Sequence, residues 1–378
     1  MAGYPGYRSD AARRIASFEF ATRACDLVFG VMYPLGPSVP RRNLSDRLNP
    51  MELYSDRQFL ARYRFTKTTV RELLTLLPLQ QTGDNRGLPL TPLLQLLVTL
   101  HFYGAGTFQM VAGDLVHVSQ PTVCRTVRTV TTLIARVLFR RLVHFPAASE
   151  YHGVMRDFYA MGQFPGVTGC IDCTHVRIRS PGRDDAEVYR NRKGVFSLNV
   201  QAITGPQLQF FDVVASWPGS VHDSRIFDGS RARALYEESR VPGVLLGDMG
   251  YACLPFLMTP LANPGAANSP GGRYNKAQIR TRNSVERAFG VWKRRFPCLD
   301  MRLQHKTRHS CSIITACAAL HNLGRARNEP LPPPPPPPPS PRARNARRRR
   351  QPHLPPILPE DSPSGLRIRQ NIILLSFT

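Results

Sequence analysis

The chain has 378 residues, 42% of them hydrophobic, which is enough for about two folded domains with a sizeable core. Its formal net charge is +24, and residues 325–378, with ten Arg and three acidic residues, carry only +7 of it, which leaves +17 for residues 1–324. A body this basic indicates a polyanionic partner, most simply nucleic acid, and eight Cys without a disulfide framework exclude a disulfide-stapled secreted domain.

Residues 1–53 predict an arm that packs on a neighbouring part of the protein. Apolar residues recur every three or four positions between Ala11 and Val31, which predicts a helix, and three prolines then break the chain. Charged residues interrupt this segment before any apolar run that a secretory signal would need. The longest apolar stretch, Leu88 to Gly104, is too short and too broken to span a membrane. We therefore expect a soluble, intracellular protein.

Residues 54–145 predict an all-helical region. The helical apolar spacing, with Thr66 as a helix start and Pro92 in a first turn, places five helices. They are expected at Asp56–Tyr63, Thr66–Leu77, Leu93–Tyr103, Thr107–Leu115 and Pro121–Phe139. The last two, separated by a tight turn, form a helix-turn-helix pattern in which Ser119 caps the second helix.

The helix that starts near Pro121 is the candidate recognition helix. Its expected outward face carries four polar or basic residues that suit base edges and phosphates: Gln120, Thr122, Arg125 and Arg128. The alternative is a helical bundle that only braces the following domain. The sequence leaves both readings open, and the basic residues favour contact with DNA.

Residues 163–324 change from a helical to a strand-like period. Strands are expected at Val167–Ile171, His175–Ile178, Ser197–Thr204, Leu208–Val214 and Val244–Leu246, and a Gly/Pro/Asn loop at 262–275. Helices are expected at Asp223–Glu237, Lys276–Arg295 and His309–Leu323. This order predicts an α/β, ribonuclease H-like domain with a mixed sheet flanked by helices.

Four acidic residues stand at the ends of these elements. Asp172 and Asp248 each follow a buried strand, Asp223 follows Ser220-Val221-His222, and Glu286 lies in the long helix. Carboxylates brought together at such junctions repel each other and need a cation. Oxygen ligands of this kind suit Mg²⁺ or Mn²⁺, so the four acids predict a metal-dependent site that cuts phosphodiester bonds.

Two further segments have plainer interpretations. Cys170 and Cys173 form the only close Cys pair, and without a second pair or a CxxH partner they are better explained as small residues flanking a strand end than as zinc ligands. The segment 325–378 contains an uninterrupted proline run, Pro332 to Pro339, and the cluster Arg347 to Arg350. We expect a disordered Pro/Arg-rich tail, with nuclear import, nucleic-acid tethering or SH3/WW binding as alternatives.

The order of short motifs between about 60 and 324 resembles the PIF/Harbinger family of DDE transposases, and within it the domesticated transposase-derived nucleases of vertebrates. The motifs are Gly169-Cys170-Ile171-Asp172-Cys173-Thr174-His175, Tyr189-Arg190-Asn191-Arg192-Lys193-Gly194, Ser197-Leu198-Asn199, Trp217-Pro218-Gly219-Ser220-Val221-His222-Asp223-Ser224, Leu246-Gly247-Asp248, Tyr274-Asn275, Val285-Glu286-Arg287-Ala288-Phe289 and Leu320-His321-Asn322. The resemblance implies a divalent-metal nuclease whose metal ligands fall on the same four acids. It also implies a nuclear and cytoplasmic protein that works with a separate Myb-like DNA-binding protein. The tail lies outside the family pattern.

The expected roles follow from this frame. Asp172 bridges two metals about 4 Å apart, while Asp248 and Glu286 each hold one, so these three residues are the candidate catalytic set. Asp223 is expected as an outer ligand or helix cap. Basic residues beside the acids would line a DNA path: Arg190, Arg192, Lys193, Arg287, Lys293, Arg294 and Arg295. His175 and His222 are expected to make structural hydrogen bonds.

Two rivals to the nuclease remain. One is a non-catalytic DNA-binding or scaffold protein on a retained transposase fold, against which the four intact acids argue. The other is a phosphatase-like hydrolase of small substrates, which leaves the +17 charge of residues 1–324 without a role.

Overall fold

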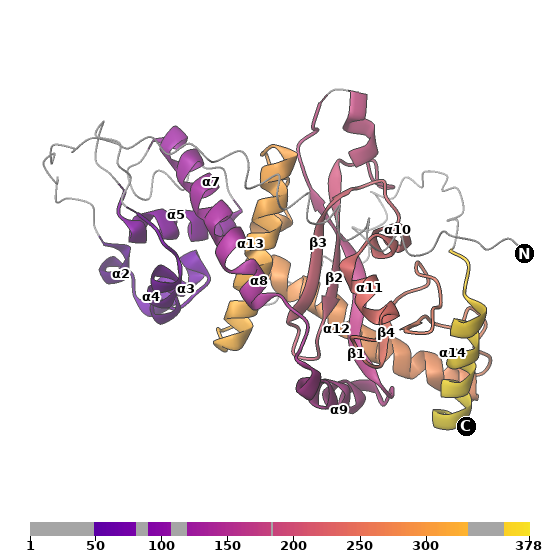
Figure 1. The fold of residues 1–378 in the computed structure, drawn as a ribbon. Coiled ribbons are helices and arrows are strands. Elements are labelled where there is room, and N and C mark those ends of the chain that lie inside the picture. The colour runs from indigo at the N-terminus through magenta and orange to yellow at the C-terminus, as the bar shows by residue number, and fades with distance from the viewer. Residues whose placement is uncertain (1–48, 81–89, 107–118, 183, 332–358) are drawn as a thin grey trace, which may run out of the picture.

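A five-stranded mixed sheet forms the centre of the molecule. The computed structural model describes residues 49–80, 90–106, 119–182, 184–331 and 359–378 (Figure 1). The sheet has the order β3-β2-β1-β4-β5. Its strands are β1 (Val167–Arg177), β2 (Ser197–Thr204), β3 (Phe210–Pro218), β4 (Val244–Leu246) and β5 (Leu257–Met258). The first three pair antiparallel, and β4 and β5 run parallel to β1, which confirms the ribonuclease H-like layout.

The strands differ in detail from those expected. The two segments expected as Val167–Ile171 and His175–Ile178 form one strand, because Asp172, Cys173 and Thr174 continue the ladder with β2. Strand β3 starts later than expected and runs on to Pro218. Strand β4 has the expected bounds.

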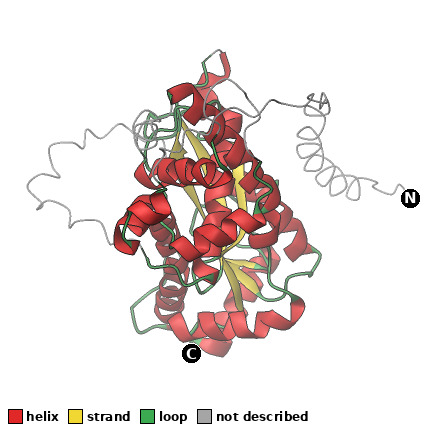
Figure 2. Cartoon of the chain, turned by 90° about the vertical axis from the view of Figure 1, so that its left-hand side faces the viewer, coloured by secondary structure: helices red, strands yellow, loops and turns green. Residues whose placement is uncertain are grey.

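Helices cover both faces of the sheet (Figure 2). One face packs on α12 (Pro270–Arg295) and α9 (Tyr151–Gly162), while α13 (Thr307–Ala326) contacts β3. The other face packs on α10 (Asp223–Asp228) and α11 (Arg231–Glu237). Alternation along β1 divides its side chains between these layers: Cys170 and Val176 join the α12 side, and Ile171 joins the α10/α11 side.

Helix boundaries follow local capping chemistry. The single helix expected at Asp223–Glu237 is two helices, because the chain breaks at Gly229-Ser230 and the Ser230 side chain caps α11. Helix α12 starts six residues earlier than expected, inside the segment taken for a loop. Ser269 caps it there, with its Oγ accepting from the Gly272 N–H at 3.1 Å.

The helical region contains α2 (Pro50–Leu53), α3 (Asp56–Tyr63), α4 (Lys67–Leu76), α5 (Pro92–Ala105), α7 (Gln120–Val137) and α8 (Phe139–Leu142). Short 3-10 turns lie at Ala148–Glu150, Asp184–Tyr189 and Pro297–Leu299. Ser119 stands at the start of α7, but its side chain makes no cap bond and contacts the Thr122 hydroxyl at 3.0 Å instead. The expected helices at 11–31 and 107–115 lie outside the described residues.

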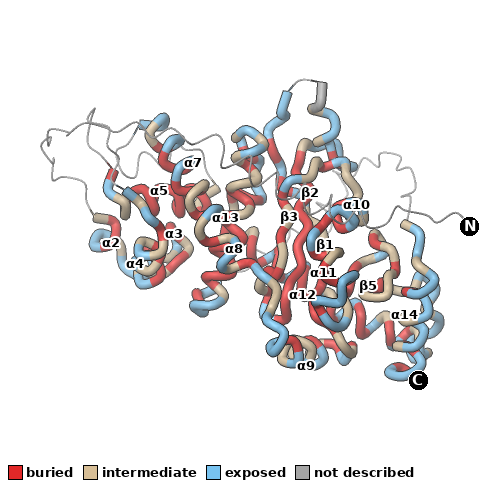
Figure 3. The backbone as a smooth tube through the Cα atoms, in the orientation of Figure 1, coloured by how far each residue is buried: buried red, intermediate tan, exposed pale blue. Residues whose placement is uncertain are grey.

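The helical region and the sheet domain share one continuous core (Figure 3). Arg295 at the end of α12 is 1% exposed and donates to the backbone carbonyls of Arg64 and Pro330 at 2.9 and 3.1 Å. The Glu329 carboxylate accepts from the Thr66 N–H at 3.0 Å, at the start of α4. Arg295, expected on a DNA path, is therefore a buried structural residue.

The expectation of disorder over 325–378 is wrong for residues 359–378. Helix α14 (Pro363–Ser376) packs on α12 and β5. Phe377 is buried, with its ring centroid 5.8 Å from those of Phe164 and Tyr274. Ile373 and this Phe, with the partly buried Ile368 and Ile372, supply the buried surface that the Pro/Arg-rich stretch lacks. The proline run and Arg347–Arg350 lie outside the described residues.

Candidate active site

The parallel pairing of β1 with β4 brings Asp172 and Asp248 to neighbouring positions. Cys170 pairs with Leu246, and each acid follows two residues later on its own chain. Asp172 Oδ1 accepts from the Cys173 N–H at 2.7 Å, and Asp248 Oδ1 accepts from the Gly250 N–H at 2.9 Å. A nearby backbone N–H therefore orients each carboxylate, although Asp172 lies within β1 and does not follow a strand end as expected.

The Asp172 carboxyl has a strongly raised pKa. Burial, together with the smaller effects of the Asp248 and Asp223 charges, raises this pKa to about 7. The Cys173 N–H bond and the Arg282 charge act in the opposite direction. A buried carboxyl with two carboxylates close by is the situation in which a divalent cation is stabilising.

Glu286 faces the site from α12, and Arg282 lies between it and Asp172. Arg282 Nη1 is 3.1 Å from Asp172 Oδ2, and Nη2 is 2.8 Å from Glu286 Oε1. The Arg282 side chain is 15% exposed, whereas that of Glu286 is 53% exposed. The four-residue spacing of Arg282 and Glu286, which is visible in the sequence, puts both on one helix face.

Asp223 lies on the other face of the sheet, as the first residue of α10. His222 occupies the N-cap position, so the expected capping role of Asp223 is wrong. Its Oδ1 accepts from the Asn199 side chain at 2.8 Å, and the same Asn199 amide donates to the Val221 carbonyl at 2.9 Å. Asn199, which the sequence did not single out as a site residue, positions Asp223.

The histidines and cysteines near the acids have structural contacts. His175 Nδ1 is 3.1 Å from Ser197 Oγ, and His222 Nδ1 is 3.0 Å from Ser224 Oγ, as expected for structural hydrogen bonds. Cys170 lies on the α12 side of β1, 3.6 Å from the Thr281 carbonyl. Cys173 lies on the other side, 3.4 Å from the Tyr251 hydroxyl. The pair therefore points to opposite faces and does not share a zinc ion.

The four carboxylates are the kind of oxygen ligand that a hard divalent cation prefers, but their side chains are not grouped closely enough to surround one. Within the described ranges, no three His, Cys, Asp or Glu residues stand close enough together to hold a metal. The contacts explain this for two of the acids, because the Arg282 guanidinium already bridges Asp172 and Glu286. The carboxylates of Asp172, Asp223, Asp248 and Glu286 remain the residues that would hold Mg²⁺ or Mn²⁺.

Basic residues gather beside the acids. Lys293 Nζ donates to the His175 carbonyl at 3.1 Å. Burial lowers the pKa of the His175 ring most, and the charges of Lys193, Lys293 and Arg192 lower it further. Arg287 is exposed directly after Glu286.

Three other candidate DNA contacts are arranged differently. The Arg190 guanidinium pairs with Glu187 at 2.7 Å and stacks over Phe196, which reduces its availability to a phosphate. Arg125 and Arg128 are exposed on α7, and α7 belongs to the helical region rather than to the sheet that carries the acids. The candidate DNA-binding residues therefore form two separate groups.

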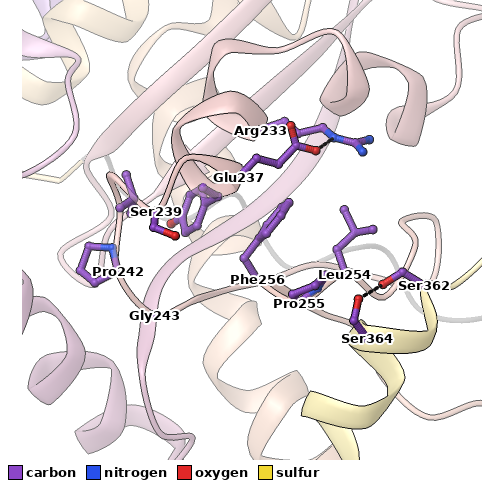
Figure 4. A pocket seen from close by; sticks show the side chains of 12 residues that line it. Arg233, Glu237, Ser239, Pro242, Gly243, Leu254, Pro255, Phe256, Ser362 and Ser364 are labelled. Atoms are coloured by element: carbon purple, nitrogen blue, oxygen red, sulfur yellow. Dashed lines mark hydrogen bonds and ion pairs between the residues drawn. The ribbon is translucent and has the colours of Figure 1, made fainter. Parts of the chain in front are cut away.

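A surface pocket of ≈ 540 Å³ lies away from the four acids (Figure 4). It is lined by Arg233, Tyr236 and Glu237 of α11, the 239–243 turn, Leu254–Phe256, and Ser362 and Ser364 at the start of α14. None of the four acids lines this pocket. In the part of the chain that the structure describes, no helix is long and apolar enough to cross a membrane.

Comparison with known proteins agrees with this geometry. Residues 171–322 match the family model described as DDE superfamily endonuclease. The protein named "Putative nuclease HARBI1" is 34% identical in Bos taurus and 33% in Homo sapiens over 277 residues, which cover 71% of this chain and 78% of each relative. The Xenopus laevis protein of the same name is 31% identical over the same shares. No solved structure matches the chain significantly. The chain therefore belongs to the PIF/Harbinger family of DDE superfamily endonucleases.

Proposed function

We propose that this protein is a nuclease that hydrolyses DNA phosphodiester bonds with Mg²⁺ or Mn²⁺ held by Asp172, Asp223, Asp248 and Glu286. The observation that carries the proposal is the parallel pairing of β1 with β4, which places Asp172, in the middle of β1, beside Asp248, just after β4, with Glu286 facing them from α12. Asp172, Asp248 and Glu286 are the catalytic set, and Asp223 is an outer ligand. When bound, the metal supplies Lewis acidity for the scissile phosphate and a water of lowered pKa.

The protein's own residues position the DNA. Arg192 and Lys193 are exposed near His175, which follows Asp172 by three residues on β1, so a phosphate backbone held by these basic residues passes next to the acids. Lys293, whose side chain is 18% exposed, adds positive charge there. Arg287 extends this basic surface along α12. Arg125 and Arg128 on α7 provide a second contact, remote from the chemistry.

The test is nicking of supercoiled DNA with Mg²⁺ or Mn²⁺. We expect the wild type to nick and Asp172→Asn to be inactive, with EDTA abolishing the wild-type reaction. Arg156→Ala, on the exposed face of α9, is the matched folded control. An inactive wild type that still binds Mn²⁺ and DNA would favour the scaffold alternative. The Arg282 ion pairs, which neutralise two of the acids without a metal, are the feature consistent with that alternative.

We propose further that the protein acts in the nucleus as well as the cytoplasm, together with a separate Myb-like DNA-binding protein. Family membership supports this assignment. Co-purification of such a protein with the tagged chain, and nuclear staining that depends on it, are the expected observations.

A further inference from the structure

The position of Arg282 goes beyond the ligand set of the proposed nuclease. Its two terminal nitrogens each hold one carboxylate, Asp172 at 3.1 Å and Glu286 at 2.8 Å. A fork of this kind matches two carboxylate oxygens in a way that a lysine does not. The side chain is largely buried, so this cation supplies the positive charge that the facing carboxylates need.

Both oxygens of Asp172 are already engaged. Oδ1 accepts from the Cys173 N–H and Oδ2 pairs with Arg282. A divalent cation shared by Asp172 and Glu286 needs the oxygens that the guanidinium now contacts. Two positive groups on the same pair of carboxylates also repel each other. Metal and Arg282 therefore compete for the same anions.

If the Arg282 guanidinium leaves this bridge, it can bind another anion. Arg282 stands one helical turn before Glu286, whose side chain is half exposed, and the exposed Arg287 follows on the same helix. The phosphate backbone of DNA bound on this surface would be such an anion, and a planar fork suits it well.

We propose that Arg282 is an exchangeable counter-charge: it bridges Asp172 and Glu286 in the metal-free protein, and metal binding transfers it to a DNA phosphate. This rests on the proposed function. It makes Arg282 a positioning residue that couples metal binding to DNA binding. The coupling is reciprocal, so DNA that accepts the guanidinium also strengthens metal binding.

The first measurement is Mn²⁺ affinity by calorimetry, on the full chain without DNA. Arg282→Gln removes the competitor, and its Mn²⁺ affinity is expected to rise roughly tenfold. Arg280→Gln is the matched control, because it removes the same charge from an exposed position two residues earlier on α12. Arg282→Lys keeps the charge but not the fork, so its affinity is expected between those of the wild type and Arg282→Gln.

The second measurement is the salt dependence of DNA binding, with EDTA and with Mn²⁺, using a duplex that is checked for cuts afterwards. With Mn²⁺, Arg282→Gln is expected to lower the slope of log affinity against log salt by roughly 0.9, the value for one lost phosphate contact. With EDTA its slope equals that of the wild type, because Arg282 is then held by the acids. For the control Arg280→Gln, we expect the same change in slope with EDTA and with Mn²⁺, or no change in either.

The outcomes separate the two proposals. If wild type binds Mn²⁺ and Arg282→Gln binds it no more tightly than Arg280→Gln does, the exchange is wrong and the nuclease assignment stands. A slope change that is the same with EDTA and with Mn²⁺ also overturns the exchange. If the wild type does not bind Mn²⁺ at all, both proposals fail. Should Arg282→Gln not fold, as judged by thermal unfolding, the same comparisons are made with Arg282→Lys, whose Mn²⁺ affinity must exceed that of the wild type.

Discussion

The Asp172 carboxyl gives the metal-free site a distinctive pH dependence. Burial, and then the charge of Asp248, raise its pKa in the folded protein to about 7, above the ordinary value of 3.8. The folded state therefore binds this proton more tightly than the unfolded chain. The resulting stabilisation is fully present below pH 3.8 and is lost as the pH rises through about 7.

Asp172→Asn removes this titration. In EDTA at pH 8 we expect the variant to be more stable to thermal or urea unfolding than the wild type, by about 2 kcal/mol, with the advantage shrinking toward pH 5. Mn²⁺ should stabilise only the wild type at pH 8. A variant that is less stable than wild type at pH 8 would mean that the attraction to Arg282 outweighs the desolvation of Asp172.

Asp248 and Asp223 should differ in their importance for cleavage. Asp248 follows β4 beside Asp172, whereas Asp223 begins α10 and already accepts a bond from Asn199. Asp248→Asn is expected to abolish metal-dependent nicking as fully as Asp172→Asn does. Asp223→Asn should retain part of the activity and recover more at high Mn²⁺, as expected for an outer ligand.

Nicking assays paired with Mn²⁺ calorimetry distinguish these variants. Asn199→Ala offers a matched comparison, because it leaves the Asp223 carboxylate in place and removes its amide partner. It should resemble a mild form of Asp223→Asn. Complete loss at Asp223 with little effect at Asp248 would contradict the assignment of the second acid to the fourth strand.

At the scale of elements, α14 ties the loop after Asp248 to the start of α12. The Cys253 N–H donates to Asp361 at 2.7 Å, and the Ser362 N–H donates to the Cys253 carbonyl at 2.9 Å. Arg273 of α12 donates through Nε to the Phe377 carbonyl at 2.8 Å. Gly365 packs against the Cys253 carbonyl so closely that a Cβ would collide with it. The C-terminal segment thus braces the polypeptide that follows Asp248.

Phe377→Ala tests this brace. Loss of a buried aromatic ring is expected to cost about 3 kcal/mol of unfolding free energy. Leu375→Ala is the matched control, since that side chain is 85% exposed and its loss should cost almost nothing. Hydrogen exchange should show faster opening of residues 249–259 in Phe377→Ala. Unchanged exchange there would mean that α14 is an appendage and does not support the site.

The sequence predicted the sheet more completely than the site. Alternation and buried runs are local signals, so β2 and β4 were found with the expected bounds. The order of the elements was enough to place Asp248 beside Asp172. The spacing of Arg282 and Glu286 is visible in the sequence, but the contact of Arg282 with Asp172 depends on the distance between β1 and α12, which no local pattern encodes. Helix α14 was missed because the Pro/Arg-rich stretch before it dominates the composition of the tail.

At the scale of the whole molecule, the question is which surfaces carry the +17 charge of residues 1–324. Two candidate groups lie on different parts of the structure: Arg125 and Arg128 on α7, and Arg192, Lys193 and Lys293 around His175. In Figure 1, α7 lies on one side of the sheet, with the rest of the helical region, and α14 lies on the other. DNA that meets both basic groups must extend from the acids to the helical region, so each group should contribute independently to the salt dependence.

Two double variants separate these groups in binding titrations over a range of salt. Arg192→Ala with Lys193→Ala is expected to reduce the slope of log affinity against log salt by roughly 1.8, two phosphate contacts. Arg125→Ala with Arg128→Ala should do the same if α7 holds DNA. Arg156→Ala with Arg367→Ala, on α9 and α14, removes two exposed charges elsewhere and should change the slope little. A folded Arg125/Arg128 variant with the control's slope would make the helical region a brace, consistent with the buried Arg295 that ties α12 to it.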